Sequence, residues 1–228
     1  MEITYIGHSG FLVELSDYYF LFDYFEGELP TLDANKPLLL FASHFHQDHF
    51  NPEIFKKLEK QKLVYGIFSK DIFESRTPEN MKKWFVAPEQ SYEPLPEIKV
   101  ETLRSTDKGV AFLVKTEEAL LYHAGDLNDW VWEGQTEQER RSMTGRYQKE
   151  IKKLNGRKID VAFIPLDVRQ KKDYDRGILY FLENTETKKV IPMHFWKQPE
   201  IIEYFLKEHP EWKKQILAMK KPLEKVSL

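Results

Sequence analysis

Cysteine is absent from this chain of 228 residues. That absence excludes disulfides, thiolate nucleophiles and zinc sites built on cysteine, and it leaves histidine and carboxylate side chains as the metal ligands on offer. Charge of one sign is not in excess either, because 34 Lys and Arg stand against 37 Asp and Glu. A nucleic-acid partner normally requires a clustered basic excess, so the composition disfavours that class of partner.

Long hydrophobic runs are also missing, and the longest, such as 38–42, are far too short to cross a membrane. Residues 1–6 read as a strand and lack the basic and apolar regions of a signal peptide. What the chain does have is 41% hydrophobic residues, among them 16 Phe, 11 Tyr and 5 Trp, which is enough for a sizeable core. These features predict a soluble, cytoplasmic globular protein with no membrane partner.

The pattern of apolar segments predicts strands followed by helices, twice over. The expected strands are 1–6, 11–15, 18–22, 38–42, 63–68, 98–103, 110–115, 120–123, 160–164 and 190–193, and the expected helices are 51–60, 136–154, 174–182 and one beginning near Pro199. The stretch 88–96 carries three prolines and is the best candidate for a junction between two halves. This order predicts a single α/β domain in which two sheets face each other with helices outside.

The strongest functional signal is the run His-Phe-His-Gln-Asp-His at residues 44–49, directly after the expected strand 38–42. In an extended segment alternate side chains point the same way, so His44 and His46 can share one metal ion. A turn after them would direct Asp48 and His49 toward a second ion. Two divalent ions about 3.5–4 Å apart can hold a hydroxide between them, so the run predicts a dinuclear metal site.

This run resembles the H-x-H-x-D-H signature of the metallo-β-lactamase fold superfamily, and further pieces match in order along nearly the whole chain. Residues 6–10 (Ile-Gly-His-Ser-Gly) resemble an N-terminal turn of the branch related to ascorbate-6-phosphate lactonase, and Phe22-Asp23 matches a strand-ending aspartate. Residues 123–126 (His-Ala-Gly-Asp) look like the motif of a bridging aspartate, and 191–194 (Ile-Pro-Met-His) like the strand of the final histidine. The resemblance implies a four-layer αββα sandwich of two mixed β-sheets over residues 1–228.

The resemblance also implies a set of site residues. The implied ligands are His44 and His46 for the first metal, Asp48, His49 and His194 for the second, and Asp126 as the bridge. Asp48 and Asp126 would also act in catalysis, together with His8 at the rim, which can hydrogen-bond a substrate oxygen or serve as an outer partner. Asp126 and His194 each follow an expected strand, so both can face the same edge of the fold.

One departure from the family pattern concerns the first metal. The family normally supplies a further histidine midway between the run and the bridging aspartate, and the matching stretch 104–109 has Asp107 at that place. As an oxygen ligand, Asp107 would make the site one unit less positive and shift its preference from Zn toward Mn or Fe. The alternatives are a site occupied mainly at the second metal, and an Asx-type turn at Asp107 ahead of Gly109.

Weaker candidates have open alternatives. Asp23 is expected to orient a ligating histidine through its ring N–H, and His123 is expected to pack in the core. The stretch 128–132, with two tryptophans, either walls the pocket or belongs to the core. Arg169 either holds a phosphate or carboxylate of the substrate, or forms a local ion pair with Asp167.

These observations predict a metal-dependent hydrolase in which a metal-bound hydroxide attacks a small ester, lactone or phosphorylated metabolite. The expected cofactors are two divalent ions, Zn or Mn, with Fe as a further option, and the expected partner is a small molecule. One alternative is a phosphodiesterase or nuclease of the same superfamily, which the near-neutral charge disfavours. Another is a non-catalytic metal- or ligand-binding module with an impaired first metal position. The sequence leaves the oligomeric state open, and a homo-oligomer is compatible with it.

Overall fold

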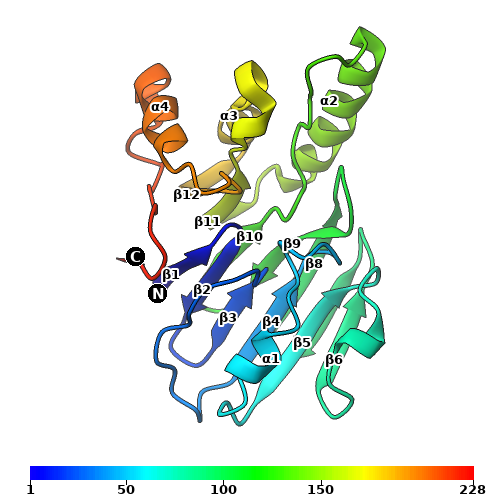
Figure 1. Cartoon of the computed structure of the whole chain (residues 1–228), viewed down its shortest axis with the longest axis vertical. Helices are drawn as coiled ribbons and strands as arrows, with labels where there is room; N and C mark the ends of the chain where they lie inside the picture. Colours follow the sequence, from blue (N-terminus) through cyan, green and yellow to red (C-terminus); the bar gives the residue numbers. More distant parts are fainter.

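Two β-sheets packed face to face form the centre of the computed structural model, which describes residues 1–228 (Figure 1). The first sheet has seven strands in the order β13-β1-β2-β3-β4-β5-β6, and the second has six in the order β12-β11-β10-β9-β8-β7. The strands are β1 (Glu2–Gly7), β2 (Gly10–Glu14), β3 (Tyr19–Phe22), β4 (Leu38–Ala42), β5 (Val64–Ser69), β6 (Lys82–Val86), β7 (Ser91–Leu95), β8 (Ile98–Arg104), β9 (Val110–Lys115), β10 (Leu120–His123), β11 (Lys158–Pro165), β12 (Glu186–Met193) and β13 (Lys225–Ser227).

The helices are unevenly distributed over the two sheets. They are α1 (Ile54–Lys57), α2 (Glu137–Ile151), α3 (Arg176–Asn184) and α4 (Glu200–Glu208), with 3₁₀ turns at Glu74–Arg76, Lys152–Leu154, Val168–Asp173 and Pro210–Trp212. In Figure 1, α2, α3 and α4 lie in a row beside β10, β11 and β12, whereas α1 lies beside β4 and β5. The expected sandwich with helices outside is confirmed, but a single helical turn and loops cover the first sheet.

The two sheets have the same plan. In each, the first strands along the chain from one half are antiparallel, and the strands that follow them are parallel. In the first sheet β1, β2 and β3 are antiparallel and β3 to β6 are parallel. In the second, β7 to β10 are antiparallel, and β10, β11 and β12 are parallel. The chain passes from one sheet to the other between Val86 and Ser91.

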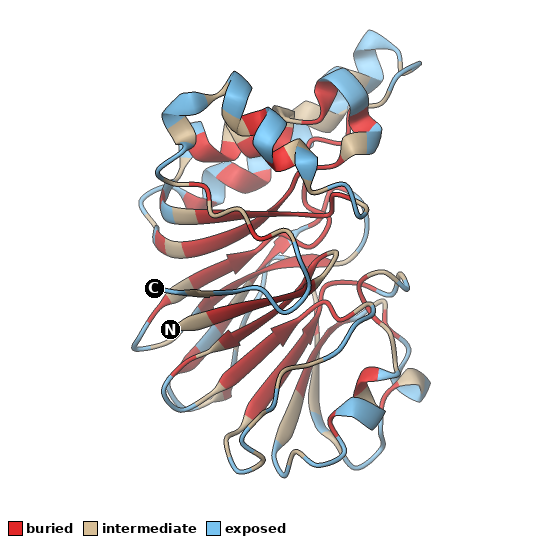
Figure 2. Cartoon of the chain, turned by 60° about the vertical axis from the view of Figure 1, so that its left-hand side comes forward, coloured by how far each residue is buried: buried red, intermediate tan, exposed pale blue.

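The main core lies between the sheets and under the helices, and strand β4 shows how the sequence builds it. Leu39 and Phe41 point into this core, while Leu38, Leu40 and Ala42 point to a smaller cluster on the outer face, so the strand is buried on both faces as predicted. Phe41 meets Phe112 of the second sheet at a ring-centroid distance of 5.3 Å. Each such buried side chain contributes about 1.5–3 kcal/mol. Figure 2 shows the strands buried over most of their length.

Four elements differ from the sequence prediction. The helix expected at 51–60 is the single turn α1, because the Gln61 N–H donates to the carbonyl of Leu58 and the chain turns away toward β5. The edge strands β6, β7 and β13 were not predicted, and β7 occupies much of the proline-rich stretch 88–96. A proline is tolerated in β7 because that strand is at the edge of its sheet.

The long polar helix expected at 136–154 is confirmed. It begins at Thr136, whose hydroxyl accepts from the Glu139 N–H while the Glu139 carboxylate accepts from the Thr136 N–H, a reciprocal capping box. Helix α2 ends at Ile151 and continues as a 3₁₀ turn to Leu154. No helix of the structure is both long and apolar enough to cross a membrane.

Candidate metal centre

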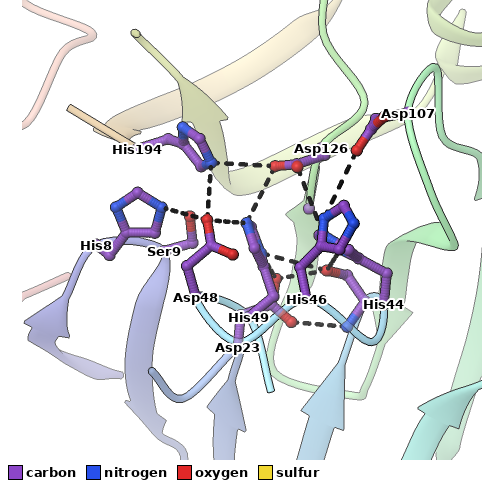
Figure 3. A network of polar contacts seen from close by, with 12 residues as sticks. His8, Ser9, Asp23, His44, His46, Asp48, His49, Asp107, Asp126 and His194 are labelled. Carbon is purple, nitrogen blue, oxygen red and sulfur yellow. Dashed lines mark hydrogen bonds and ion pairs between the residues drawn. The ribbon is translucent and has the colours of Figure 1, made fainter. Parts of the chain in front are cut away.

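The residues singled out from the sequence meet at one edge of the sandwich (Figure 3). Each lies just after the carboxyl end of a strand: His8 after β1, Asp23 after β3, the run 44–49 after β4, Asp107 after β8, Asp126 after β10, Asp167 after β11 and His194 after β12. Ligand sites of α/β sheets commonly form at the carboxyl ends of strands, where loops bring together residues distant in sequence. Strands of both sheets therefore contribute to a single site.

At this edge the candidate ligand atoms form two groups. The first group contains His44, His46, Asp107 and Asp126, and the second contains His8, Asp48, His49 and His194; within each group the atoms lie within 4.8 Å of one another. Asp126 lies between the groups. Its Oδ2 is 3.5 Å from His44 Nε2, and its Oδ1 is 3.1 Å from His49 Nε2 and 3.3 Å from His194 Nε2. The geometry suits a bridging carboxylate.

Buried polar atoms without hydrogen-bond partners test whether these residues fit a metal. The Nε2 atoms of His8, His49 and His194 and the Oδ1 atom of Asp126 are all buried and form no hydrogen bond. Leaving a buried donor or acceptor unpaired costs about 1–3 kcal/mol. Four such atoms directed at one another are the donor set that a divalent ion would satisfy, so the residues fit a metal centre.

The opposite ring nitrogens of three histidines are held by outer partners. Nδ1 of His49 lies 2.7 Å from Asp23 Oδ2, and Nδ1 of His194 lies 2.9 Å from Asp167 Oδ2. Nδ1 of His44 lies 3.0 Å from Ser43 Oγ, which itself donates to Asp23. Such partners fix the ring orientation and direct Nε2 toward the centre. The bond between Asp23 and a histidine ring was predicted from the sequence and is confirmed.

Asp167 has a larger role than the sequence suggested. It forms the expected ion pair with Arg169, with two contacts of 3.0 Å to Nε and one of 2.6 Å to Nη2. The same carboxylate also accepts from His194 and from the Trp196 indole N–H at 3.3 Å. The sequence offered a weak signal for this second role, namely an acid just after a buried strand. These contacts hold the pKa of Asp167 at about 2 although burial alone would raise it.

Burial is the largest influence on the pKa values at the site. It lowers the pKa of His44 to about 3 and that of His8 to about 4, so both rings are neutral at neutral pH, the form that binds metals. Burial would raise the pKa of Asp126, but His49 and His194 hold it well below its usual value. His49 lies between Asp126 and Asp23, which raise its pKa in spite of burial. A metal ion would displace the His49 proton, because ligands bind metals in their deprotonated forms.

Backbone strain is concentrated around the centre. His8, Asp23 and His194 have φ angles of 53°, 42° and 66°, in the left-handed region that costs side-chain-bearing residues about 1–3 kcal/mol. Gly125 also has a positive φ, and a Cβ there would lie 2.6 Å from the Cβ of Ser43. Glycine therefore lets the loop that carries Asp126 approach the start of the histidine run.

Asp107 reaches the first group, where the family pattern has a histidine. Its Oδ2 lies 3.7 Å from His46 Nδ1. The Asx-type turn considered for Asp107 does not form, because its carboxylate accepts no hydrogen bond from the Gly109 N–H; instead the Asp107 N–H donates to the Ser105 hydroxyl at 3.1 Å. The side chains of His46 and Asp107 are 37% and 44% exposed, so the centre opens to solvent on this side.

The remaining candidates lie around the centre. His123 belongs to neither group: its ring stacks on Phe22 at 5.0 Å and its Nε2 bonds to the Ser9 carbonyl, which confirms the packing role. Trp130 is a buried core residue and also lies beside the metal centre. It is buried, donates its indole N–H to the Asp126 carbonyl at 2.8 Å and lies 5.6 Å from the His194 ring.

Comparisons with known proteins agree with this architecture. A family model described as a β-lactamase superfamily domain matches residues 2–142. No curated protein matches the sequence. The structure is similar to Igni18, a metallo hydrolase of the hyperthermophilic archaeon Ignicoccus hospitalis, with a TM-score of 0.69 and 18% identity over 99% of this chain and 97% of that one.

Two further solved structures share the fold. An isothiocyanate hydrolase from Delia radicum gut bacteria matches with a TM-score of 0.65 and 15% identity, over 100% of this chain and 99% of that one. CmlA, a diiron β-hydroxylase from Streptomyces venezuelae, matches with a TM-score of 0.65 and 12% identity, over 100% of this chain but 54% of that one. At these identities the similarity establishes the fold and nothing finer.

Proposed function

Because the chain belongs to the β-lactamase superfamily, whose family model spans residues 2–142, we propose that it is a metal-dependent hydrolase with a dinuclear centre. The observation that carries this proposal is the convergence of unpaired, buried imidazole and carboxylate atoms on one point, with Asp126 between two groups of donors. These atoms approach one another or Asp48 at 3.1–3.3 Å but form no hydrogen bond, whereas the polar atoms of a purely structural cluster would be hydrogen-bonded.

The proposed role of each residue follows from its position. His44, His46, Asp107 and Asp126 would hold the first ion; His8, Asp48, His49 and His194, with the second oxygen of Asp126, would hold the other. Divalent ions bound at these positions would make a water acidic enough to be deprotonated at neutral pH and would polarise a carbonyl or phosphoryl oxygen. The chain itself orients the rings through Asp23, Asp167 and Ser43.

Asp48 is the group best placed to handle a proton. Burial would raise its pKa, but the contact with His8 at 3.3 Å and the nearby His49 lower it, so the carboxylate is ionised at neutral pH. Its side chain is 22% exposed, which leaves it accessible from the open side of the centre. Because Oδ2 is directed at His8, His49 and His194, Asp48 can exchange a proton with a water molecule or a leaving group at its other oxygen, Oδ1.

The proposed substrate is a small ester, lactone or phosphorylated metabolite. The resemblance of residues 6–10 to the lactonase-like branch supports a carbonyl substrate, and the near-neutral composition gives no support to the nuclease alternative. Asp107 adds a third carboxylate to the two donor groups, which supports Mn or Fe over Zn at the first position. A cytoplasmic location stays a prediction from the sequence.

Substitution of His46 tests the proposal directly. We expect His46→Ala to lose metal from the first position and to lower hydrolysis by about 100-fold or more, because one ligand of a preorganised centre is removed. Metal content is quantified after purification without chelator, and turnover is measured on carboxylic esters, a lactone, phosphomonoesters and phosphodiesters. His209→Ala is the matched control for turnover, because His209 lies outside both donor groups and bonds to Asp175. It does not control for metal content, because His209, Asp175 and Glu208 form a separate cluster of possible ligands.

Three outcomes separate the alternatives. Full activity of His46→Ala would exclude this mechanism. Stoichiometric metal binding without hydrolysis of any ester or phosphate, relative to chelator-treated protein, would favour the non-catalytic module. Preferential hydrolysis of the phosphodiester would favour the phosphodiesterase alternative.

A further inference from the structure

A cavity of about 820 Å³ adjoins the second donor group and shares His8 with it. It lies between the end of β1, the loop after β3, the loop before α4 and the C-terminal segment. Its apolar wall consists of Tyr5, Ile6, Phe25, Phe195 and Trp196. Cavities of roughly 300–1,000 Å³ with apolar walls and few polar groups are typical binding sites for small molecules.

His8 connects this cavity to the centre. Its Nε2 lies 3.3 Å from Asp48 Oδ2, while its ring contacts Trp196 at a centroid distance of 4.5 Å and Phe25 at 5.9 Å. The imidazole ring of His8 therefore lies between the aromatic side chains and the other donor atoms of the second group. A substrate whose reacting bond lies at the donor groups can place an adjoining substituent in the cavity.

Trp196, which lines the cavity, has a strained backbone conformation and is held in place by contacts of its side chain. Its φ angle is 48°, which is a genuine outlier for so bulky a residue. The indole N–H donates to Asp167 at 3.3 Å, and the guanidinium of Arg169 lies 4.5 Å from its ring centroid. Strained residues that the surroundings hold in place cluster at ligand sites. Asp167 thus fixes both His194 and Trp196, coupling the wall to the centre.

The charges around the cavity indicate what it binds. Lys197 is paired with Glu26 at 2.7 Å, Lys220 is paired with Glu203, and Glu200 adds a further acid to the lining. Arg169, behind Trp196, is already neutralised by Asp167. The cavity therefore has no surplus positive charge with which to hold a phosphate or carboxylate group.

We infer that this cavity binds an uncharged, apolar substituent of the substrate, such as a phenyl or branched alkyl group next to the cleaved bond. The inference rests on the proposed hydrolase function and narrows its substrate class from phosphorylated metabolites to apolar esters or lactones. Trp196 and Phe25 determine the specificity, because they form the part of the wall that contacts His8.

A binding measurement tests the cavity independently of hydrolysis. The neutral fluorescent probe N-phenyl-1-naphthylamine is titrated into the metal-free full-length protein, and saturable binding is expected. Phe25→Ala and Trp196→Ala should each weaken it by about tenfold, as expected when an aromatic wall is removed. Tyr204→Ala is the matched control, because Tyr204 is an exposed aromatic residue that does not line the cavity. Circular dichroism checks that each variant folds, and Trp196→Phe should retain most of the binding.

A kinetic measurement tests the role in catalysis. The metal-loaded enzyme is given acetyl and phenylacetyl thioesters of 2-mercaptoethanol, and the released thiol is read directly because the chain has no cysteine. We expect kcat/KM to be about tenfold or more higher for the phenylacetyl thioester, since a filled apolar pocket discriminates by this order. Trp196→Ala should abolish the preference, whereas Tyr204→Ala should keep it.

The outcomes separate the two proposals. Hydrolysis with equal kcat/KM for both thioesters, or probe binding unaffected by Phe25→Ala and Trp196→Ala, would overturn the cavity assignment and leave the hydrolase proposal intact. A phosphomonoester preferred over the phenylacetyl thioester would also overturn it. Probe binding that depends on Trp196, without hydrolysis of any substrate, would support the cavity as a ligand site and overturn the hydrolase proposal.

Discussion

The carboxylate of Asp107 determines how much negative charge the first donor group carries. With Asp126 it gives that group two carboxylates beside two imidazoles, and both are within reach of one ion. The neighbouring Asp126 also raises the pKa of Asp107, in addition to the larger effect of burial, so the two carboxylates repel each other until a cation lies between them. Hard, oxygen-preferring ions gain most from such a pair.

Replacing this carboxylate should change the metal preference. We expect Asp107→His to raise the affinity for Zn relative to Mn by about tenfold or more, which corresponds to about 1.4 kcal/mol. The histidine supplies a nitrogen ligand and removes one negative charge. Competition between the two ions, read by metal analysis after dialysis, measures the ratio.

A second variant at this position separates charge from ligand type. Asp107→Asn removes the same charge without supplying a nitrogen ligand, so it should weaken both ions and leave their ratio nearly unchanged. An unchanged ratio in Asp107→His as well would show that Asp107 is not a ligand.

The loops after β8 and β10 are the elements that bring the second sheet's carboxylates to the histidine run. Gly109 closes the first of these loops with a φ of 67°, and a Cβ there would lie 2.6 Å from the Cβ of His44 and closer still to the Ser43 carbonyl oxygen. The same carbonyl accepts from the Val110 N–H at 3.0 Å. This close approach of two backbones places Asp107 beside His46.

Gly109→Ala should therefore be strongly destabilising. The left-handed backbone alone costs an alanine about 1–2 kcal/mol, and the clash should bring the loss to about 3 kcal/mol or more. The measurement is urea unfolding of the metal-free protein. Gly134→Ala is a matched control: its φ is also positive, at 87°, but a Cβ there would meet nothing within 4 Å. Equal losses in the two variants would mean that the contact with Ser43 contributes nothing.

The local part of the centre could be predicted from the sequence, and the reason is physical. The run 44–49 follows an apolar strand, and extended geometry alone sets the relation between His44 and His46. Asp126 and His194 were found from the order of motifs, since each ends a strand. Asp23 was also placed correctly, as the partner of a histidine ring.

Contacts between distant elements could not be predicted. His8 is a full member of the second donor group, and no local pattern indicates this. Its position depends on how the end of β1 meets the end of β12, where the His194 N–H donates to the His8 carbonyl at 3.2 Å. The joint role of Asp167 toward His194 and Trp196 depends on the same packing. Edge strands such as β13 have short, weak patterns, and their pairing partners decide whether they form.

At the scale of the whole molecule, the centre joins the two sheets. His8 and the run 44–49 come from the first sheet, and Asp107, Asp126 and His194 come from the second. An ion held by ligands from both sheets binds the folded state and not the separated sheets, so metal binding should contribute directly to the free energy of unfolding.

Metal removal should therefore lower the thermal stability of the entire chain. At a free metal concentration 100 times Kd, binding adds about 2.7 kcal/mol, which for a domain of this size corresponds to a Tm shift of about 5–10 °C. Scanning calorimetry with and without chelator measures the shift. Asp126→Ala, which removes the carboxylate between the two groups, should show a much smaller metal-dependent shift than the wild-type protein. A wild-type Tm that does not respond to metal would mean that the donor atoms do not hold an ion between the sheets.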